Sequence, residues 1–182
     1  VGSSPSSQFS EVQHEVPMLS LDKVVDEAGL RSFDSRVISR LDGIPVLDYS
    51  CEPKVDGIAV SLLFEGGRLV RGSTRGDGER GEDITQNIKN LSGIPHKLIS
   101  VPSNSRLEVR GEVFLSKSGF ESLNQRAGKD GTKIFVNPRN TASGAMRQLD
   151  PKLSRKVPLQ MFCYGVGAVS YTHLTLPTNR EV

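Results

Sequence analysis

The four residues Lys54-Val55-Asp56-Gly57 place an amine, a carboxylate and a glycine directly before an apolar run that begins at Ile58. A lysine amine acts as a nucleophile only when it is unprotonated, and an ordinary pKa of about 10.4 leaves few such amines at neutral pH. Burial or a nearby cation can activate such an amine, and an oriented carboxylate can hold it in line or accept its proton. The tetrapeptide therefore indicates Lys54 as a covalent nucleophile with Asp56 beside it, although a solvated turn has the same composition.

Further polar motifs occur on both sides of Lys54. In chain order they are His14-Glu15-Val16-Pro17-Met18-Leu19-Ser20-Leu21, Thr74-Arg75-Gly76-Asp77-Gly78, Gly81-Glu82-Asp83-Ile84-Thr85, Val109-Arg110-Gly111-Glu112-Val113-Phe114, Asn137-Pro138-Arg139-Asn140, Arg147-Gln148-Leu149-Asp150 and Phe162-Cys163-Tyr164-Gly165. Each has a plain structural alternative. These alternatives are a surface ion pair of Glu52 with Arg75, a tight turn at 75–78, cross-strand charges on a solvated face for Arg110 and Glu112, and a core position for Tyr164. The ordered set favours a functional site over these alternatives.

Strands must position the carboxylates of this set. Alternation over 106–115 predicts a strand that carries Glu108, Arg110 and Glu112 on one side and apolar residues on the other. The run 58–64 is apolar on both faces, which predicts a strand covered on both sides. The predicted sheet is completed by a hairpin partner over 68–73, reached through a turn at 65–67, and by a strand over 159–166.

N-cap signals predict the helices. Asn137 followed by Pro138 is typical of a helix start, and this helix would run to about residue 149. Arg139 would then lie at its N-terminal end, where anions bind well. The other predicted helices cover 34–41, 84–91 with Asp83 as N-cap, and a segment from Ser118 to about 127.

Composition is typical of a soluble protein with one core. The 182 residues are 36% hydrophobic and 24% charged, and with 5% aromatic residues and no Trp the core should be aliphatic. No stretch is long enough to span a membrane and no secretion signal is evident, so we expect a cytoplasmic protein without a membrane partner. Two cysteines are too few for a disulfide scaffold or a zinc site, and we expect Cys51 to be a small structural residue in a buried position.

Charge is unevenly distributed along the chain, although the net charge is only +2. Residues 106–169 carry 11 Lys and Arg against 5 Asp and Glu, whereas residues 1–105 carry 11 against 15. Surface scatter can produce such a difference. The functional interpretation is a basic face that approaches the phosphates of a nucleotide or of DNA.

In their order and spacing, the motifs resemble the adenylation domain of bacterial NAD-dependent DNA ligases. The Lys-x-Asp-Gly motif is shared with ATP-dependent ligases and capping enzymes, whereas the segments 74–78 and 137–150 favour the NAD-dependent branch. The resemblance implies an α/β fold of the α+β kind. This would be an ATP-grasp-like nucleotidyltransferase core of mainly antiparallel sheets packed with helices, with the nucleotide between the sheets.

The resemblance also implies a role for each motif residue. Lys54 would attack the α-phosphorus of NAD, forming a phosphoramidate to AMP and expelling nicotinamide mononucleotide. Asp56 and Glu112 would lie near the ribose and the metal, with Glu112 as a candidate Mg²⁺ ligand. The other implied nucleotide contacts are Ser20, Leu21, Glu52, Arg75 and Tyr164, the last stacked on adenine, and the implied contacts to phosphates or nicked DNA are Arg139 and Arg147.

The resemblance covers 13–169 as a partial adenylation domain. A Ser-rich linker over 1–12 would precede it, and we interpret 170–182 as foreign sequence. We expect the fold to be incomplete at both ends and the chain alone to have little or no nick-sealing activity. The parent enzyme would be a monomer that uses NAD and Mg²⁺ to seal nicks in duplex DNA. Two alternatives stay open: a nucleotidyltransferase that uses ATP or GTP, such as an ATP-dependent ligase or capping enzyme, and a module that binds a nucleotide without chemistry.

Overall fold

The computed structural model describes residues 8–41 and 46–170, which belong to two compact units. One unit combines the chain up to Met18 with the chain from Val55 onward, and the other is Leu19–Lys54. We describe each unit by itself. In the described part of the chain, no helix has both the length and the apolar composition that crossing a membrane requires.

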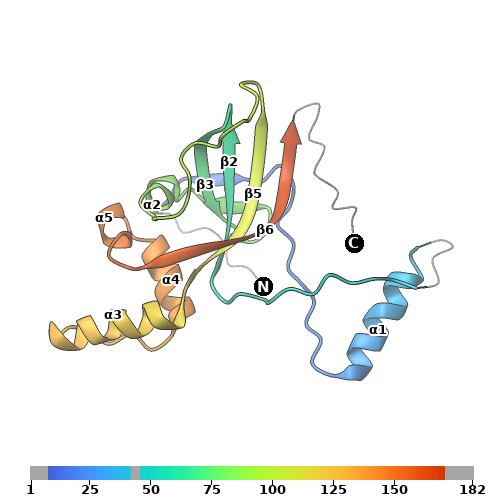
Figure 1. Cartoon of the computed structure of the whole chain (residues 1–182), viewed down its shortest axis with the longest axis horizontal. Helices are drawn as coiled ribbons and strands as arrows, with labels where there is room; N and C mark the ends of the chain where they lie inside the picture. Colours follow the sequence, from blue (N-terminus) through green and yellow to red (C-terminus); the bar gives the residue numbers. More distant parts are fainter. Residues whose placement is uncertain (1–7, 42–45, 171–182) are drawn as a thin grey trace. The chain divides into compact units, whose positions relative to one another are not determined.

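A four-stranded sheet forms the centre of the first unit (Figure 1). Its strand order is β3 (Arg68–Thr74), β2 (Ile58–Glu65), β5 (Arg106–Leu115) and β6 (Leu159–Ser170), and every neighbouring pair is antiparallel. The predicted antiparallel sheet is confirmed. The bounds of β5 agree with those that alternation predicts, while β6 continues beyond the predicted end at residue 166.

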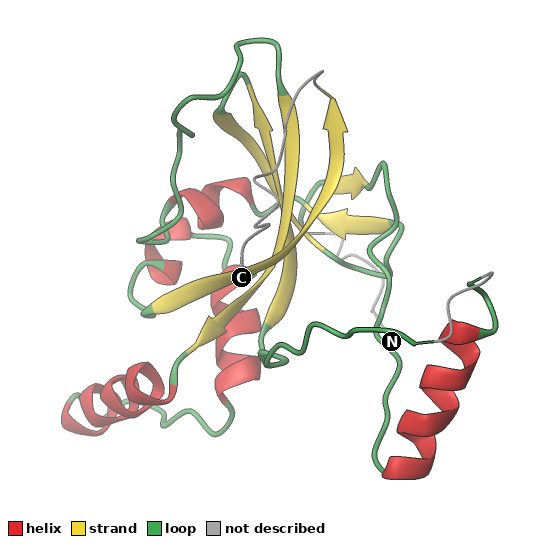
Figure 2. Cartoon of the chain, turned by 45° about the vertical axis from the view of Figure 1, so that its right-hand side comes forward, coloured by secondary structure: helices red, strands yellow, loops and turns green. Residues whose placement is uncertain are grey.

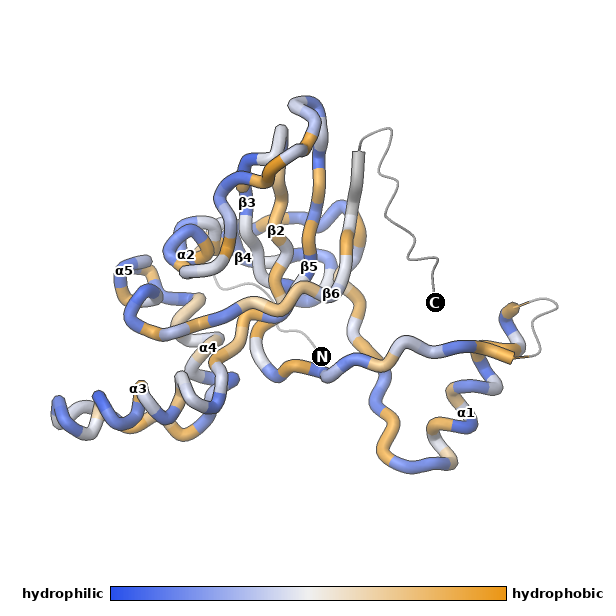
Figure 3. Tube along the Cα trace, in the orientation of Figure 1, coloured by the Kyte–Doolittle hydropathy of each residue, from blue (hydrophilic) through white to orange (hydrophobic). Residues whose placement is uncertain are grey.

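One face of this sheet forms the hydrophobic core. Val60 and Leu62 of β2 and Val113 of β5 are buried there, and Figure 3 shows how continuously hydrophobic β2 is. The face is covered by helices, which gather on one side of the sheet in Figures 1 and 2. These helices are α2 (Thr85–Lys89), α3 (Lys117–Lys129), α4 (Pro138–Met146) and α5 (Pro151–Ser154).

The predicted helix ends are partly wrong. The helix predicted over 84–91 is shorter, and Asp83 lies outside the cap position, accepting hydrogen bonds from the backbone N–H and the hydroxyl of Thr85. Ser116 rather than Ser118 caps α3. Asn137 caps α4 as predicted, but α4 ends at Met146, and Pro151 opens a further helix after a short turn.

A second, two-stranded sheet lies in the same unit and was not predicted. It pairs β1 (Glu11–Gln13) with β4 (Arg80–Glu82), with Val12 opposite Gly81. The strand β1 begins inside the segment 1–12 that we expect to be a linker. The domain boundaries at 12 and 169 stay predictions, and residues 171–182 lie outside the described residues.

Among its described residues, 19–41 and 46–54, the second unit has one helix, α1 (Glu27–Ile38), which begins earlier than the predicted 34–41. Asp26 explains the earlier start, because its side chain accepts a hydrogen bond from the Gly29 N–H at 2.7 Å. Tyr49 packs near Phe33 with ring centroids 6.0 Å apart. Cys51 is exposed, so the expectation that it is buried was wrong.

The core assignment predicts a large effect for one helix residue. Ile88 of α2 is fully buried in the core, so Ile88→Ala should lower the free energy of unfolding by about 2–5 kcal/mol. Ile99 is 90% exposed, so Ile99→Ala should change it by less than ~0.5 kcal/mol. Urea denaturation of both variants measures the difference, and equal effects would contradict the assigned core.

Candidate functional site

The Lys54-Val55-Asp56-Gly57 motif leads directly into β2, and its glycine lies against β5. A Cβ atom built on Gly57 would stand 2.1 Å from the carbonyl oxygen of Val113, so a larger residue would push the two strands apart. The Gly57 N–H donates a hydrogen bond of 3.2 Å to Oε1 of Glu112. The motif glycine therefore fixes a carboxylate that lies 55 residues away in the sequence at the start of β2.

Asp56 and Arg139 form an ion pair, which brings two of the predicted site residues together. Nη1 of Arg139 lies 3.1 Å from Oδ1 of Asp56, and both side chains are mostly exposed. An exposed pair of this kind contributes only about 0–1 kcal/mol, so an anionic ligand can replace the carboxylate at little cost. The position of Arg139 in the first turn of α4, after the Asn137 cap, also favours anions.

Arg75 follows β3 in a tight turn. Its backbone N–H donates to the Ala59 carbonyl at 3.0 Å, and the Gly78 N–H donates to the Arg75 carbonyl at 3.1 Å. Gly76 and Gly78 have positive φ angles of 59° and 110°, which glycine adopts at low cost. The tight turn that we gave as the alternative is thus present. A role for the Arg75 side chain at the ribose stays a prediction.

Tyr164 lies on the polar side of the sheet near Glu112. The register between β5 and β6 shifts, with Gly111 opposite Cys163 and Arg110 opposite Gly165, so Tyr164 is the extra residue of a β-bulge. Partial burial raises the pKa of the Tyr164 phenol, the Glu112 carboxylate raises it further, and the Arg75 and Arg110 guanidinium groups oppose them. Tyr164 is half exposed, so a plain core position is wrong.

The same face carries a buried polar network one pleat away from Glu112. Oε1 of Glu108 accepts hydrogen bonds from the Ser61 hydroxyl at 2.7 Å and from Nε of Arg110 at 3.0 Å. The side chains of Glu108 and Arg110 are only 8% and 12% exposed. Alternation placed Glu108, Arg110 and Glu112 on one face correctly, but the alternative of a solvated face, given for Arg110 and Glu112, is wrong for Arg110. On β6, a Cβ atom at Gly167 would lie 2.2 Å from Oε2 of Glu108.

Arg147 forms an ion pair with the buried Glu82 of the same unit. Its Nη2 lies 2.5 Å from Oε1 of Glu82, whose side chain is only 4% exposed. Arg147 and Arg139 stand at opposite ends of α4, about 12 Å apart along the axis. Removing Arg147 would leave a buried carboxylate without this cation, so its contribution to stability must be separated from any contact with phosphate.

Four of the predicted site residues belong to the second unit. Ser20, Leu21, Glu52 and Lys54 are all exposed there, and Lys54 is the last residue of that unit. Their roles at the nucleotide stay predictions. The residues that the structure brings together are those of the first unit: Asp56 with Arg139, and Glu112 with Gly57 and Tyr164.

Sequence reasoning assigned no function to His14, Ser61 and Glu108. His14 is buried, and its Nε2 lies 3.1 Å from the Thr74 carbonyl and 3.2 Å from the Arg75 carbonyl. Carbonyls only accept, so Nε2 carries the proton, and His14 has a structural role in holding the turn after β3. Glu108 could have been found from the alternation of β5, which put it on the same face as Glu112.

The carboxylates fit a magnesium ion only if the substrate also supplies ligands. Within residues 8–41 and 46–170, no three His, Cys, Asp or Glu side chains form a group that could hold a metal. Mg²⁺ commonly takes one or two carboxylates, substrate phosphates and water. Glu112 is therefore compatible with Mg²⁺ only in the presence of a phosphate ligand.

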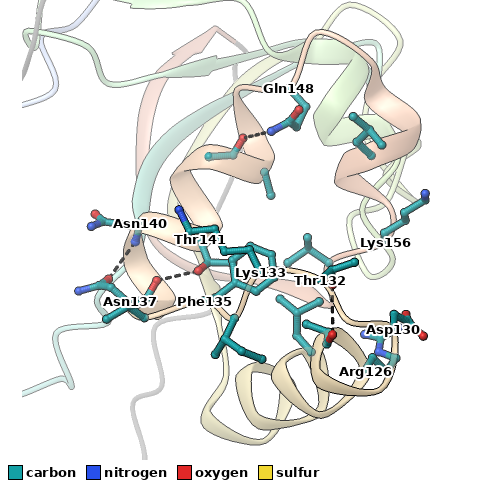
Figure 4. Close-up of a pocket in the computed structure, with 18 residues that line it drawn as sticks. Arg126, Asp130, Thr132, Lys133, Phe135, Asn137, Asn140, Thr141, Gln148 and Lys156 are labelled. Atoms are coloured by element: carbon teal, nitrogen blue, oxygen red, sulfur yellow. Dashed lines mark hydrogen bonds between the residues drawn. The ribbon is translucent and has the colours of Figure 1, made fainter.

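A groove of about 750 Å³ lies on the helical side of the first unit (Figure 4). Residues of α3, the loop that follows it, α4 and the segment around α5 line the groove, with Leu123, Phe135 and Ala145 among the apolar ones. None of the predicted site residues lines it. The groove is therefore distinct from the polar face of the sheet.

The Arg147–Glu82 pair predicts that removing Arg147 lowers the stability of the fold much more than removing Arg139, although both arginines have the same predicted function. Arg147→Ala should lower the free energy of unfolding by about 3 kcal/mol, because it removes the guanidinium group that pairs with the buried Glu82 carboxylate. Arg139→Ala breaks only an exposed pair and should cost less than about 1 kcal/mol. Denaturant titration of both variants tests this, and the double variant Arg147→Ala, Glu82→Gln should recover part of the loss. An Arg147→Ala protein as stable as the parent would refute the assignment.

The raised pKa of Tyr164 predicts a loss of stability at alkaline pH. A phenol whose folded pKa exceeds its unfolded value of about 10 contributes stability below that pH, and this contribution disappears as pH rises through the folded pKa. Tyr164→Phe should therefore lose less stability than the parent between neutral and alkaline pH. Unfolding measured over this range gives the comparison, and parallel curves for the two proteins would count against the assigned environment.

The family comparison agrees with the arrangement of these motifs. The family model described as the NAD-dependent DNA ligase adenylation domain matches residues 6–182, which is nearly the whole chain. The match includes the lysine motif before β2, the Glu112 strand and the Arg139 helix. The chain belongs to the family of NAD-dependent DNA ligase adenylation domains.

Proposed function

We propose that Lys54 is the residue of this adenylation domain that becomes covalently bound to AMP. The observation that carries the proposal is the meeting of three separate motifs at the start of β2. Gly57 binds Glu112 through its N–H, and the adjacent Asp56 pairs with Arg139. Lys54 precedes this cluster by two residues in the sequence, which supports its role as the nucleophile.

In the proposed reaction, the Lys54 amine attacks the α-phosphorus of NAD. A bond forms between the amine nitrogen and phosphorus, the bond from phosphorus to the bridging oxygen breaks, and nicotinamide mononucleotide leaves with that oxygen. The amine proton is lost to Asp56 or to water. Arg139 then has two states, paired with Asp56 as in the structure or turned to a phosphate oxygen.

The polar face of the sheet is the proposed binding surface for the nucleotide. Glu112 would contact the ribose and, with phosphate oxygens and water, hold Mg²⁺, which would neutralise charge on the phosphates. Tyr164 is half exposed, as stacking on adenine requires. The remaining proposed nucleotide contacts are Ser20, Leu21, Glu52, Asp56 and Arg75.

Nicked duplex DNA is the proposed final acceptor of the AMP group. The segment 106–169 is strongly basic, which supports an approach to phosphates. Arg139 is the better candidate for a DNA phosphate contact, because its partner is exposed whereas that of Arg147 is buried. We further propose that the parent enzyme acts as a cytoplasmic monomer in DNA replication and repair.

The lysine assignment predicts a covalent adduct. Incubation with adenine-labelled NAD and Mg²⁺ should give a label that survives denaturing electrophoresis, and Lys54→Ala or Lys54→Arg should abolish it, because neither side chain is a usable nucleophile. Lys23→Ala removes an exposed lysine of the same unit and should retain the label. An adduct that persists in Lys54→Ala would move the nucleophile elsewhere.

The same experiment separates the proposal from its alternatives. Labelled ATP in place of NAD should give no adduct, and adduct formation from ATP would favour an ATP-dependent nucleotidyltransferase. Binding of NAD without any adduct in the unmodified protein would favour a module that holds the nucleotide without chemistry.

A further inference from the structure

A short segment, residues 14–18, is fixed to the polar side of the first unit, and we call it the strap. Its two ends are hydrogen-bonded to the turn after β3: the His14 N–H donates to the Glu79 carbonyl and the Met18 N–H to the Gly78 carbonyl, each at 2.8 Å. The side chains of His14 and Met18 are buried. The strap is therefore an ordered part of the unit although it has no regular secondary structure between these ends.

The middle of the strap is held by one guanidinium group. Nη1 of Arg110 donates to the Pro17 carbonyl at 3.0 Å, and Nη2 donates to the Val16 carbonyl. The third nitrogen, Nε, donates to Glu108, so all three nitrogens of Arg110 are engaged. A planar guanidinium can form this set of bonds at once, whereas the ammonium group of lysine is a single point of charge.

Arg110 also lies next to the proposed nucleotide-binding surface. Arg110 and Glu112 lie two residues apart on β5 and so share a face, with about 7 Å between their Cα atoms. The charges of both act on Tyr164. In the sequence, the strap ends at Met18, two residues before Ser20, the first of the proposed nucleotide contacts. One side chain thus joins the strap to the face that carries Glu112.

We propose that Arg110 is a positioning residue for NAD, acting through the strap and without touching the nucleotide. The inference rests on the proposed function of the polar face. By bonding two successive carbonyls, Arg110 holds the strap in one conformation before NAD arrives, which reduces the ordering cost of binding. It also fixes the point from which the segment that carries Ser20 and Leu21 begins.

Arg110→Lys is the informative variant. It keeps a cation beside the buried Glu108, which protects the fold, but it cannot bridge the carbonyls of Val16 and Pro17 while also binding Glu108. We expect unfolding stability close to that of the parent and faster amide hydrogen exchange at Met18. We also expect about a tenfold rise in the dissociation constant for NAD, or ~1.4 kcal/mol, with the rate of adduct formation at saturating NAD within about twofold of the parent.

Arg106→Ala is the matched control. Arg106 lies on the same strand and forms ion pairs with Glu15 of the strap and with Glu65 of β2. Its contact with the strap is to a side chain and not to the backbone carbonyls that Arg110 binds, and the pair with Glu15 is substantially exposed. Its removal should leave NAD binding within about twofold of the parent. A rise equal to that of Arg110→Lys would overturn the assignment to Arg110.

Equilibrium dialysis with labelled NAD, exchange measurements and the adduct assay together distinguish the outcomes. Unchanged NAD affinity in Arg110→Lys, or unchanged exchange at Met18, overturns the positioning role. If the parent binds NAD without forming an adduct, the proposed chemistry fails, and the positioning role is upheld by a loss of affinity in Arg110→Lys. A parent that does not bind NAD at all overturns both proposals.

Discussion

The close approach of β2 and β5 at Gly57 is the constraint on which the site depends. Because Gly57 has no side chain, the backbone of the lysine motif can lie against Val113, and its N–H can reach Glu112. The same contact sets the antiparallel register that puts Ala59 opposite Glu112 and Ser61 opposite Arg110. Packing of two strands thus determines which side chains can meet on the polar face.

The two faces of the sheet in the first unit differ in chemistry and in role. The apolar face is packed under α2 and α4 and supplies most of the stabilising burial, while the other face holds ionised groups at low exposure. Such groups are stable only as a connected set, since each charge requires a partner when water is excluded. Ser61, Glu108 and Arg110 form such a set, and the charges of Glu112, Arg75 and Arg110 act on the neighbouring Tyr164.

Much of this arrangement was predictable from the sequence, for reasons that differ between elements. The strand β5 has a regular two-residue alternation, and its bounds and the shared face of Arg110 and Glu112 followed directly. The end of α4 at Met146 was missed because apolar spacing does not encode it. The pairing of Arg147 with Glu82 and the fixing of the strap by Arg110 join residues 65 and more than 90 positions apart, and such contacts arise only from the folded topology.

The β-bulge at Tyr164 has a consequence for self-association. In the described part of the chain, β6 is an outer strand of the sheet, and its exposed residues include Phe162, Tyr164 and Val166. A straight, hydrophobic edge strand of this kind can pair with a strand from a second copy of the chain. The extra residue bends the edge strand and interrupts the regular spacing of its backbone N–H and C=O groups. The register shift that sets the position of Tyr164 thereby also discourages aggregation.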